Sequence, residues 1–413
     1  MITPDVLDTI LGDWKKRMIT PHPGEVQRAL ILGGGLRPEL ATIVTGPRRA
    51  GKSTYLGQLP SRLGIPLERC WFCNFEDPDL VLHLDPRLLD SIVSLARERT
   101  PAGEMAYFFL DEIQTVPRWE KWLHKALTGV RNCVYVLTGS NASMLSGELA
   151  TALTGRYRAH ELFPFSWEEF SEARGSATLE DYLRLGGFPV AVTDPDPNGY
   201  LKELFRNIVL RDIAPRVGAR STVSLLQVVS TVYQSVGSEL SMRRIASAVG
   251  VATDTVGQYL DACAQAYMVF PCPYFSFSER QSGHRQKKYY AVDTGLRQAV
   301  SGTAGLDRGK NLENLIFLTM RRRGLPVSYW RDEGEVDFVV LAADRIIPIQ
   351  VSWEGPSERH HVALDGFYRR YPQAAEPVFI DASNAPRFVR DCEGFLRIDR
   401  DSTPPSPSPV PAS

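Results

Sequence analysis

Residues 46–53 read Gly46-Pro47-Arg48-Arg49-Ala50-Gly51-Lys52-Ser53 and fit the pattern G-x-x-x-x-G-K-[ST] without a mismatch. The preceding run ATIVTG (41–46) predicts a strand, and the following STYLGQL predicts a helix. At such a junction, glycines let backbone N–H groups surround phosphates, and the helix N-terminus adds the positive end of its dipole. The sequence therefore predicts that residues 46–53, here called the phosphate loop, bind a nucleotide together with Thr54.

Lys52 and Ser53 have specific expected roles in the phosphate loop. The Lys52 ammonium would neutralise β- and γ-phosphate oxygens, and the Ser53 hydroxyl would hold Mg²⁺. The alternative interpretation is an ordinary glycine-rich turn, which does not explain why a second acidic motif follows downstream.

That second motif is Met105-Ala-Tyr-Phe-Phe-Leu110-Asp111-Glu112, an apolar run that ends in two carboxylates. Ligands of open α/β sheets bind at the carboxyl ends of the strands, which is where this pattern delivers both side chains. We expect Asp111 to hold Mg²⁺ through water and Glu112 to act as general base on the attacking water. Capping of the next helix, QTVPRWEKWLHKAL, is the alternative. Beside a complete phosphate loop, the catalytic interpretation is preferred.

The run CVYVLTGS (133–140) predicts a further polar contact at the same edge. Ser140 and Asn141 follow its apolar residues and are candidates to contact the γ-phosphate or the attacking water. Either could instead cap the helix SMLSGELATAL. No guanine-reading Asn-Lys-x-Asp motif occurs in the sequence, which favours ATP over GTP.

An arginine near the γ-phosphate accelerates phosphoryl transfer. Arg156 follows the helix after Asn141 and is the first candidate, while Arg211 is the second. Because most arginines are solvated surface residues, each assignment competes with that simpler interpretation.

The fold class follows from apolar runs that alternate with helical segments. The runs are ATIVTG (41–46), CWFCNFE (70–76), AYFFLDE (106–112), CVYVLTGS (133–140) and HELFPF (160–165). Their alternation predicts an α/β fold in which a parallel sheet is covered by helices on both faces. Residues 4–40 predict helices, with periodic apolar positions in WKKRM and EVQRALIL.

From Ser166 the chain reads as helices, and residues 222–270 predict three of them, with a tight turn at Gly250-Val251-Ala252. Strand-like CPYFSF and KKYYAVD then flank a polar loop, as in a β-wing. The predicted domains are a nucleotide-binding core with N-terminal helices (1–165), a helical lid (166–220), a winged-helix-like domain (221–290), an α/β domain (291–400) and a disordered Pro/Ser-rich tail (401–413).

Composition excludes several classes of protein. The 413 residues are 43% hydrophobic and 23% charged, as in a globular protein, and the net charge of -1 restricts any nucleic-acid surface to a local patch. No stretch approaches the roughly 20 apolar residues of a membrane helix, and the N-terminus does not read as a signal peptide. We therefore expect a cytoplasmic protein without a membrane partner.

Cys70 and Cys73 are the pair among six cysteines with a suggestive spacing. Neither a second such pair nor a nearby histidine completes a zinc tetrahedron. The run RCWFCNFED instead predicts a buried strand, in which cysteine behaves as a small hydrophobe, and we favour this over a redox pair.

With these residues identified, the chain resembles a group of AAA-type ATPases of bacteria and archaea. In that group an ATPase core is followed by a winged-helix region and a C-terminal PD-(D/E)xK domain related to restriction-endonuclease-like folds. The matching stretches, in order, are TGPRRAGKST, NFEDP, FLDEIQTVPRWEKWL, LTGSNASMLS, LATALTGRYR, PFSWEEF, GGFP, LRDIAPR, YYAVDTGLR, LENLIF and EVDFVV. The resemblance implies the strand order of that superfamily, and roles in ATP hydrolysis for Lys52, Ser53, Asp111, Glu112, Ser140 and Arg156.

Nucleases of the PD-(D/E)xK kind use two carboxylates to hold Mg²⁺ and a lysine to activate water. Here Asp337 supplies one acid and Glu313 could add another, but Gln350 and Ser352 stand where the second acid and the lysine should be. An amide is a poor Mg²⁺ ligand and serine carries no positive charge, so we expect a nuclease fold without nuclease chemistry.

The winged-helix segment has two alternative partners. Its recognition helix, 253–261, offers only Gln258 for reading bases. Basic residues beside it could contact DNA phosphates: Arg243, Arg244, Arg280, Arg285, Lys287 and Lys288. Packing against the ATPase core or another subunit is the alternative, and both a homo-oligomer and a monomer stay open.

Together these observations predict a Mg²⁺-dependent ATPase that couples ATP state to nucleic-acid binding or remodelling. A protein-interaction switch controlled by ATP is the alternative, and an ATP-gated nuclease is the third.

Overall fold

The computed structural model describes residues 2–22, 24–129, 131–145, 153–302, 306–342 and 344–398. The chain forms two compact units, Met1–Phe163 and a second unit that begins at Pro164. The finer domain boundaries proposed from the sequence stay predictions. Within the described residues, no helix combines the length and hydrophobicity needed to cross a membrane.

The first unit is built on a parallel sheet, as the alternating apolar runs predicted. Its described strands are β1 (Ala41–Thr45), β2 (Cys70–Asn74), β3 (Ala106–Asp111), β4 (Cys133–Gly139) and β5 (Tyr157–Glu161). They are ordered β2-β3-β4-β1-β5, and every pairing is parallel. β4 lies between β1 and β3. The phosphate loop, which follows β1, and the acidic motif, which ends β3, are therefore one strand apart.

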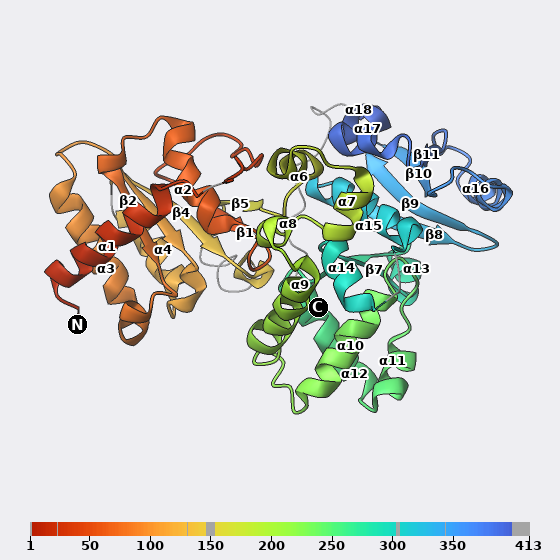
Figure 1. The fold of residues 1–413 in the computed structure, drawn as a ribbon, viewed down its shortest axis with the longest axis horizontal. Coiled ribbons are helices and arrows are strands. Elements are labelled where there is room, and N and C mark those ends of the chain that lie inside the picture. Colours follow the sequence, from red (N-terminus) through yellow and green to blue (C-terminus); the bar gives the residue numbers. More distant parts are fainter. Residues whose placement is uncertain are drawn as a thin grey trace. The chain divides into compact units, whose positions relative to one another are not determined.

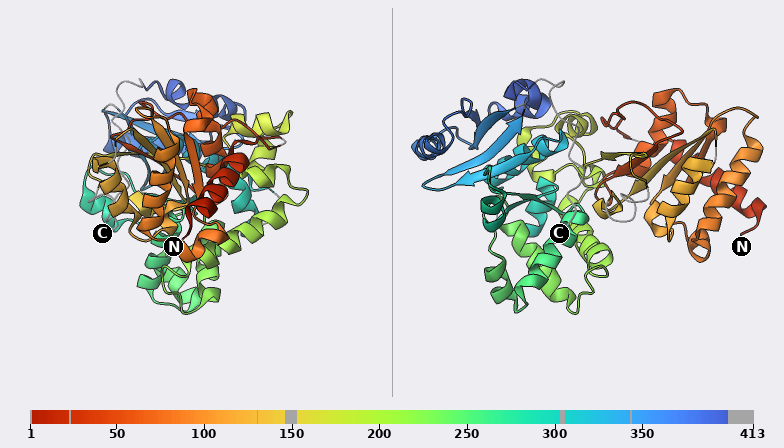
Figure 2. Two further views of the ribbon diagram at one scale, coloured as in Figure 1. Left: turned by 90° about the vertical axis from the view of Figure 1, so that its left-hand side faces the viewer. Right: turned by 180° about the vertical axis from the view of Figure 1, so that it is seen from behind.

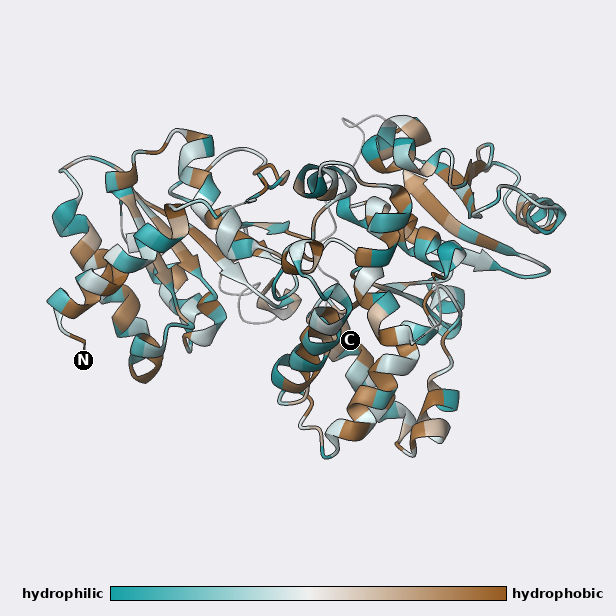
Figure 3. Cartoon of the chain, viewed as in Figure 1, coloured by the Kyte–Doolittle hydropathy of each residue, from teal (hydrophilic) through white to brown (hydrophobic). Residues whose placement is uncertain are grey.

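Helices cover both faces of this sheet (Figure 1). One face packs against α1 (Pro4–Ile19), α3 (Pro86–Arg99) and α4 (Trp119–Gly129), and the other against α2 (Lys52–Leu63). The described connections also contain short 3-10 turns: η1 (Leu67–Arg69), η2 (Pro78–His83), η3 (Ile113–Thr115) and η4 (Ala142–Leu145). Apolar residues concentrate in the strands, while the outward helix faces are polar (Figure 3). The predicted α/β core is therefore confirmed.

The last strand of this sheet differs from its prediction. HELFPF (160–165) was expected to form it, but β5 spans Tyr157–Glu161 and begins before that run. β5 is an edge strand with no fully buried position, so its polar sequence YRAHE hides it from a search for apolar runs. The apolar Leu162 and Phe163 are buried just beyond its end.

The predicted helix at EVQRALIL is wrong, because residues 25–32 have no regular secondary structure. Side chains of α2 satisfy this segment's backbone instead. Gln58 accepts from the Arg28 N–H at 3.0 Å and donates to the Val26 carbonyl at 2.9 Å, and Arg62 donates to the Arg28 carbonyl at 2.5 Å. Backbone groups satisfied in this way do not need a helix.

The cysteine prediction is confirmed. Cys70 and Cys73 are buried in β2, and they pack into opposite faces of the sheet. Burial raises the pKa of both thiols, that of Cys70 to about 12, so neither is a ready nucleophile. Opposite orientations also exclude a disulfide between them.

The second unit starts with helices and continues into two small sheets (Figure 2). Its described helices are α6 (Trp167–Arg174), α7 (Leu179–Leu185), α8 (Pro189–Thr193), α9 (Pro197–Asn207), the π-helical η5 (Ile208–Ile213), α10 (Thr222–Gln234), α11 (Met242–Val249), α12 (Thr253–Gln265), α13 (Glu279–His284), α14 (Thr294–Ser301), α15 (Arg308–Arg322), α16 (Glu358–Arg370), α17 (Ala385–Arg390) and α18 (Cys392–Leu396). Their positions agree with the helical reading of residues 166–270.

The two-stranded sheet pairs β6 (Val269–Cys272) with β7 (Lys288–Ala291) after α10, α11 and α12. The predicted first strand, CPYFSF, overlaps β6 only at Cys272. The connection is not a plain polar loop, because it contains α13. Gly250, with φ of 76°, ends α11 and makes the predicted tight turn.

The other described sheet holds β8 (Val327–Arg331), β9 (Glu335–Ala342), β10 (Arg345–Val351) and β11 (Val378–Ile380). Its order is β11-β10-β9-β8, antiparallel except between β10 and β11. In chain order this domain reads α15-β8-β9-β10-α16-β11, with α16 forming the crossover between its parallel strands.

Asp293 joins two parts of the second unit that are far apart in sequence. Its carboxylate caps α14 through the Leu296 N–H at 2.8 Å and accepts from the Gly187 N–H at 2.6 Å. Gly186 has φ of 71°, and a Cβ there would lie 2.0 Å from the Asp293 carboxylate. Burial raises the pKa of Asp293 to about 6, although these hydrogen bonds act to lower it.

We predict that Asp293 makes stability fall as pH rises. A carboxyl whose folded pKa is raised holds its proton more tightly in the folded state, so the free energy of unfolding decreases between pH 3.8 and about 6. Denaturant unfolding of wild type and Asp293→Asn should diverge across that window by on the order of 2–3 kcal/mol, since one pKa unit corresponds to about 1.4 kcal/mol. Asp196→Asn, at the exposed cap of α9, is the matched control. A variant whose pH dependence parallels that of wild type would contradict this role.

Candidate functional site

The phosphate loop connects β1 to α2 in a conformation that requires glycine at its start. Gly46 has φ of 154°, and a Cβ at this position would lie 2.0 Å from the Leu162 carbonyl oxygen. Arg49 has φ of 66°, so the loop also contains a left-handed non-glycine residue. The backbone therefore turns sharply before α2 begins at Lys52.

The Lys52 ammonium lies inside the loop, where the sequence predicted it. Its Nζ donates to the carbonyl oxygens of Gly46 at 3.1 Å and Pro47 at 3.0 Å. It also lies 3.7 Å from Glu112 Oε1, and the residue is 4% exposed. A buried ammonium with these neutral and anionic partners fits the predicted role of binding phosphate oxygens.

Asp111 is fully buried at the end of β3. It accepts from Ser53 Oγ at 2.6 Å, Asn74 Nδ2 at 2.8 Å and Thr138 Oγ1 at 2.5 Å. Burial and the charge of Glu112 raise its pKa to about 6. Because Mg²⁺ prefers oxygen ligands, the adjacent Ser53 hydroxyl and Asp111 carboxylate fit the predicted ion.

Glu112 follows with φ of 54°, a left-handed conformation that turns it away from the direction of β3. Ser140 Oγ donates to its carboxylate at 2.7 and 2.6 Å, and Gln114 Nε2 donates as well. Burial opposes its charge, but Lys52 and these hydrogen bonds outweigh burial and hold the pKa below its ordinary value. A lowered pKa suits the predicted role of general base, which requires an ionised carboxylate.

The end of β4 connects the two acids. Thr138, fully buried, donates to Asp111 and accepts from the Glu112 backbone N–H at 3.0 Å. Ser140 contacts Glu112, and Asn141 is buried beside it at the start of η4. The structure thus brings together Lys52, Ser53, Asp111, Glu112 and Ser140. Residues 146–152 of the predicted helix SMLSGELATAL lie outside the described residues.

Arg156 is not brought to this edge of the sheet. It is exposed just before β5, and its carbonyl oxygen accepts from the Ala41 N–H at 3.0 Å at the opposite end of β1. Arg156 is therefore separated from the carboxyl ends of the strands by the length of β1, about 13 Å at roughly 3.3 Å per residue. Arg211 is exposed on η5 in the second unit.

Several residues of the site were not found from the sequence. Arg28 is buried and donates to the carbonyl oxygens of Ala50 at 2.5 Å and Phe163 at 2.7 Å, which supports the phosphate loop from outside the motif. Asn74 and Gln114 hold the two acids as described above. Asn74 lies in NFEDP, a stretch singled out by resemblance, whereas Arg28 carries no local signal.

A cavity of about 550 Å³ opens beside the phosphate loop. Its lining includes Ser53 and Thr54 of α2 together with Trp14, Met18 and His22. An aromatic and a thioether side chain next to the first turn of α2 are suited to a flat heterocycle.

A separate cluster in the second unit corrects one prediction. Lys288 was expected among the exposed basic residues of the wing, but it is fully buried on β7. Its Nζ lies 2.5 Å from Glu335 Oε1 and 3.5 Å from Glu313 Oε1. It therefore holds β7 against β9 and α15, and it cannot contact DNA phosphates.

The predicted nuclease positions adjoin this cluster, at a cavity of about 1000 Å³. Gln350 is 1% exposed, and its amide donates to the Glu335 carbonyl at 2.9 Å. Asp337 accepts from the Val351 N–H at 2.8 Å, and burial together with the charge of Glu313 raises its pKa to about 7. Glu313, Asp337 and Ser352 line the cavity wall.

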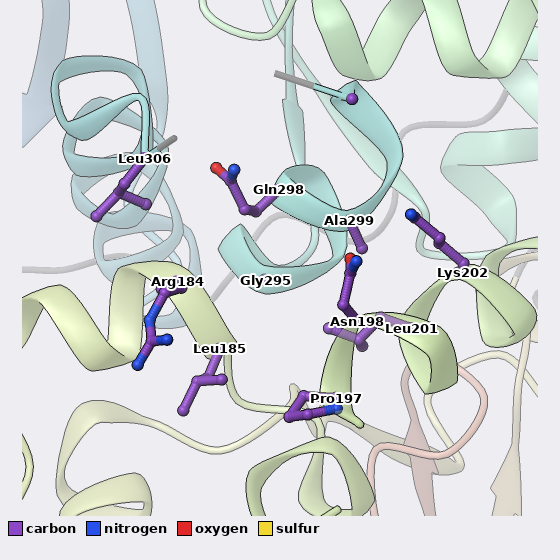
Figure 4. A pocket seen from close by; sticks show the side chains of 11 residues that line it. Arg184, Leu185, Pro197, Asn198, Leu201, Lys202, Gly295, Gln298, Ala299 and Leu306 are labelled. Carbon is purple, nitrogen blue, oxygen red and sulfur yellow. The ribbon is translucent and has the colours of Figure 1, made fainter. Parts of the chain in front are cut away.

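Another cavity of the second unit, about 470 Å³, lies between α7, α9 and α14 (Figure 4). Leu185, Leu201 and Ala299 give it an apolar wall, and Arg184 and Lys202 stand at its sides. It gathers no acid–base pair of the kind seen around Lys52 among its described lining residues.

Comparison with known families is consistent with this geometry. The profile described as "AAA domain" matches residues 39–171. Two domains of unknown function, DUF8612 and DUF4143, match residues 176–307 and 308–398.

Relatives with similar sequences occur in both bacteria and archaea. A Haemophilus influenzae protein is 33% identical over 77% of this chain and 84% of its own length. One from Methanocaldococcus jannaschii is 26% identical over 89% of this chain and 86% of its own. Both are described as uncharacterized proteins. The structure of Caenorhabditis elegans PCH-2 is similar at 16% identity and a TM-score of 0.23, over 63% of this chain and 67% of that one, a likeness too weak to support an argument.

We predict that Ser140→Ala lowers ATP turnover about tenfold or more, because it removes a hydroxyl from Glu112, the predicted general base. Ser140→Thr keeps the hydroxyl and is the matched control, expected to stay within about threefold of wild type. Steady-state phosphate release at saturating ATP measures both. Equal losses in the two variants would assign Ser140 a packing role.

Proposed function

The chain belongs to the family of AAA-domain proteins that includes the Haemophilus influenzae relative, and we propose that it binds MgATP at the phosphate loop and hydrolyses it. The carrying observation is the buried network in which Lys52, Ser53, Asp111, Glu112 and Ser140 meet at one edge of the sheet. A nucleoside triphosphate is the ligand whose charge, oxygen atoms and reactivity fit these five residues.

Each side chain then has a distinct task. Lys52 binds the β- and γ-phosphate oxygens, leaving the loop carbonyls it now contacts. Glu112 orients the water that attacks the γ-phosphorus and accepts its proton. As the bond to the β–γ bridging oxygen breaks, ADP and inorganic phosphate form. Mg²⁺, when bound, would neutralise phosphate charge, and Ser53 and Asp111 would hold it.

The cavity beside Ser53 and Thr54 supplies a place for the nucleoside. Met18 and Trp14 offer apolar contact to a purine, and Thr54 extends the polar wall from the phosphate loop. A catalytic role for Arg156, exposed at the opposite edge of the sheet, would require a neighbouring copy of the chain. A homo-oligomer would provide that arrangement.

We further propose that ATP state is coupled to DNA through the second unit, whose α10–α12 and β6–β7 would form a winged helix. Arg243 and Arg244 are exposed on α11, and Arg280, Arg285 and Lys287 are exposed on the β6–β7 connection. Such residues suit contacts to phosphates. Asp254 and Asp261 on α12 disfavour base reading, so the binding would be independent of sequence.

The α15–β11 domain is proposed to have an endonuclease-like fold without nuclease chemistry. Gln350 uses its amide on the backbone of β9, and Lys288 is neutralised by Glu335 and Glu313. Neither side chain is then available to hold a metal ion or activate water.

We predict that duplex DNA raises ATP turnover several-fold at low salt and that Lys52→Ala abolishes turnover with or without DNA. Stimulation should weaken steeply as salt rises, because phosphate contacts release counterions. In a DNA-binding titration, Arg280→Ala should reduce the salt slope by about one. Turnover indifferent to DNA would move the proposal to a protein partner. Wild-type protein without turnover would contradict the ATPase itself.

A further inference from the structure

We propose that Arg48, within the phosphate loop, is a catalytic arginine supplied by the same chain as the rest of the site. When ATP binds, the Arg48 guanidinium exchanges its contact with Glu76 for one with the γ-phosphate. The proposal rests on the proposed ATPase function and adds a residue to its mechanism. It also adds a carboxylate that competes with the γ-phosphate for this guanidinium.

Arg48 stands at the right place in the loop for this role. It follows Pro47, whose carbonyl oxygen accepts from Lys52 Nζ at 3.0 Å. Glu112 must face the γ-phosphorus to deliver water to it, and Lys52 must bind the γ-phosphate oxygens. Arg48 therefore lies on the stretch of the loop that would surround the γ-phosphate.

The Arg48 guanidinium is ion-paired with Glu76, with 2.8 Å between Nη2 and Oε1. The pair is open to solvent, because the Arg48 side chain is 24% exposed and that of Glu76 is 43% exposed. Solvent-exposed ion pairs of this kind are weak. A γ-phosphate carries more charge and offers several acceptor oxygens, so it can take the guanidinium from the carboxylate.

The segment that carries Glu76 is held firmly against the site. The Glu76 N–H donates to Asn74 Oδ1 at 2.7 Å, and Asn74 Nδ2 donates to Asp111 at 2.8 Å. Phe75 is fully buried, and its N–H donates to the Asp111 carbonyl at 3.0 Å. Asp77 accepts from Trp14 Nε1 at 2.5 Å. The backbone of Glu76 is therefore held beside the residues that contact Asp111.

The consequence for the reaction is charge stabilisation at the γ-phosphate. Water attacks the γ-phosphorus and its proton passes to Glu112, while the bond to the β–γ bridging oxygen breaks. Negative charge grows on the bridging oxygen of ADP, and the γ-oxygens stay charged throughout. A guanidinium that reaches the bridging oxygen as well as a γ-oxygen would stabilise this growing charge without a residue from a second subunit.

The test separates a contact to the γ-phosphate from a general role in the loop. Binding of MgATP and of MgADP by wild type and Arg48→Ala is measured by titration calorimetry in protein that also carries Glu112→Gln, which prevents turnover. Arg48→Ala should weaken MgATP binding about tenfold or more and change MgADP binding less than about twofold. In the otherwise wild-type protein it should lower kcat about 100-fold.

Two further variants complete the design. Glu76→Gln removes the competing charge and should strengthen MgATP binding by up to about threefold without weakening MgADP binding. Arg87→Ala, which removes an exposed arginine paired with Asp85, controls for the loss of positive charge in this unit.

Equal weakening of MgATP and MgADP binding by Arg48→Ala would show a loop-shaping role and overturn the inference. An unchanged kcat would overturn it as well. Both outcomes leave the ATPase itself standing, whereas wild type that neither binds nor hydrolyses MgATP would contradict the proposed function.

Discussion

The burial of the Asp111 carboxylate is the constraint on which the rest of the site depends. A carboxylate removed from water must be hydrogen-bonded, and Ser53, Asn74 and Thr138 all donate to it. These donors follow or end β1, β2 and β4, so a single side chain ties the carboxyl ends of neighbouring strands together. The phosphate loop, the loop that carries Glu76 and the end of β4 are thereby held in fixed positions around one point.

The pKa of Glu112, the next residue, is shifted in the opposite direction. Burial raises the pKa of Asp111 to about 6, whereas Lys52 and hydrogen bonds from Ser140 and Gln114 outweigh burial and lower that of Glu112. Adjacent acids whose pKa values are pushed apart suit different tasks, here the proposed metal binding and general base catalysis. Lys52 and Arg48 supply the positive charge for both this separation and the proposed nucleotide.

Much of this site could be predicted from the sequence, because its motifs are local. Lys52, Ser53, Asp111 and Glu112 lie at strand ends with clear apolar flanks, and the sheet brings them together. Arg28 could not be predicted, since its contacts with Ala50 and Phe163 depend on an irregular segment that periodicity reads as a helix. The prediction that Lys288 contacts DNA was wrong because its partners Glu313 and Glu335 come from elements far along the chain, and they could not be identified from the local sequence. The predicted position of the fifth strand was wrong because an edge strand such as β5 needs no alternation of apolar residues.

The central claim, that this edge of the sheet binds ATP and that Glu112 carries the chemistry, is tested most directly by comparing binding and single-turnover hydrolysis in Glu112→Gln. The substitution keeps the shape of the side chain and removes its ability to accept a proton. The account predicts MgATP affinity within about threefold of wild type and hydrolysis slowed about 100-fold or more. Hydrolysis at the wild-type rate in Glu112→Gln would contradict the account.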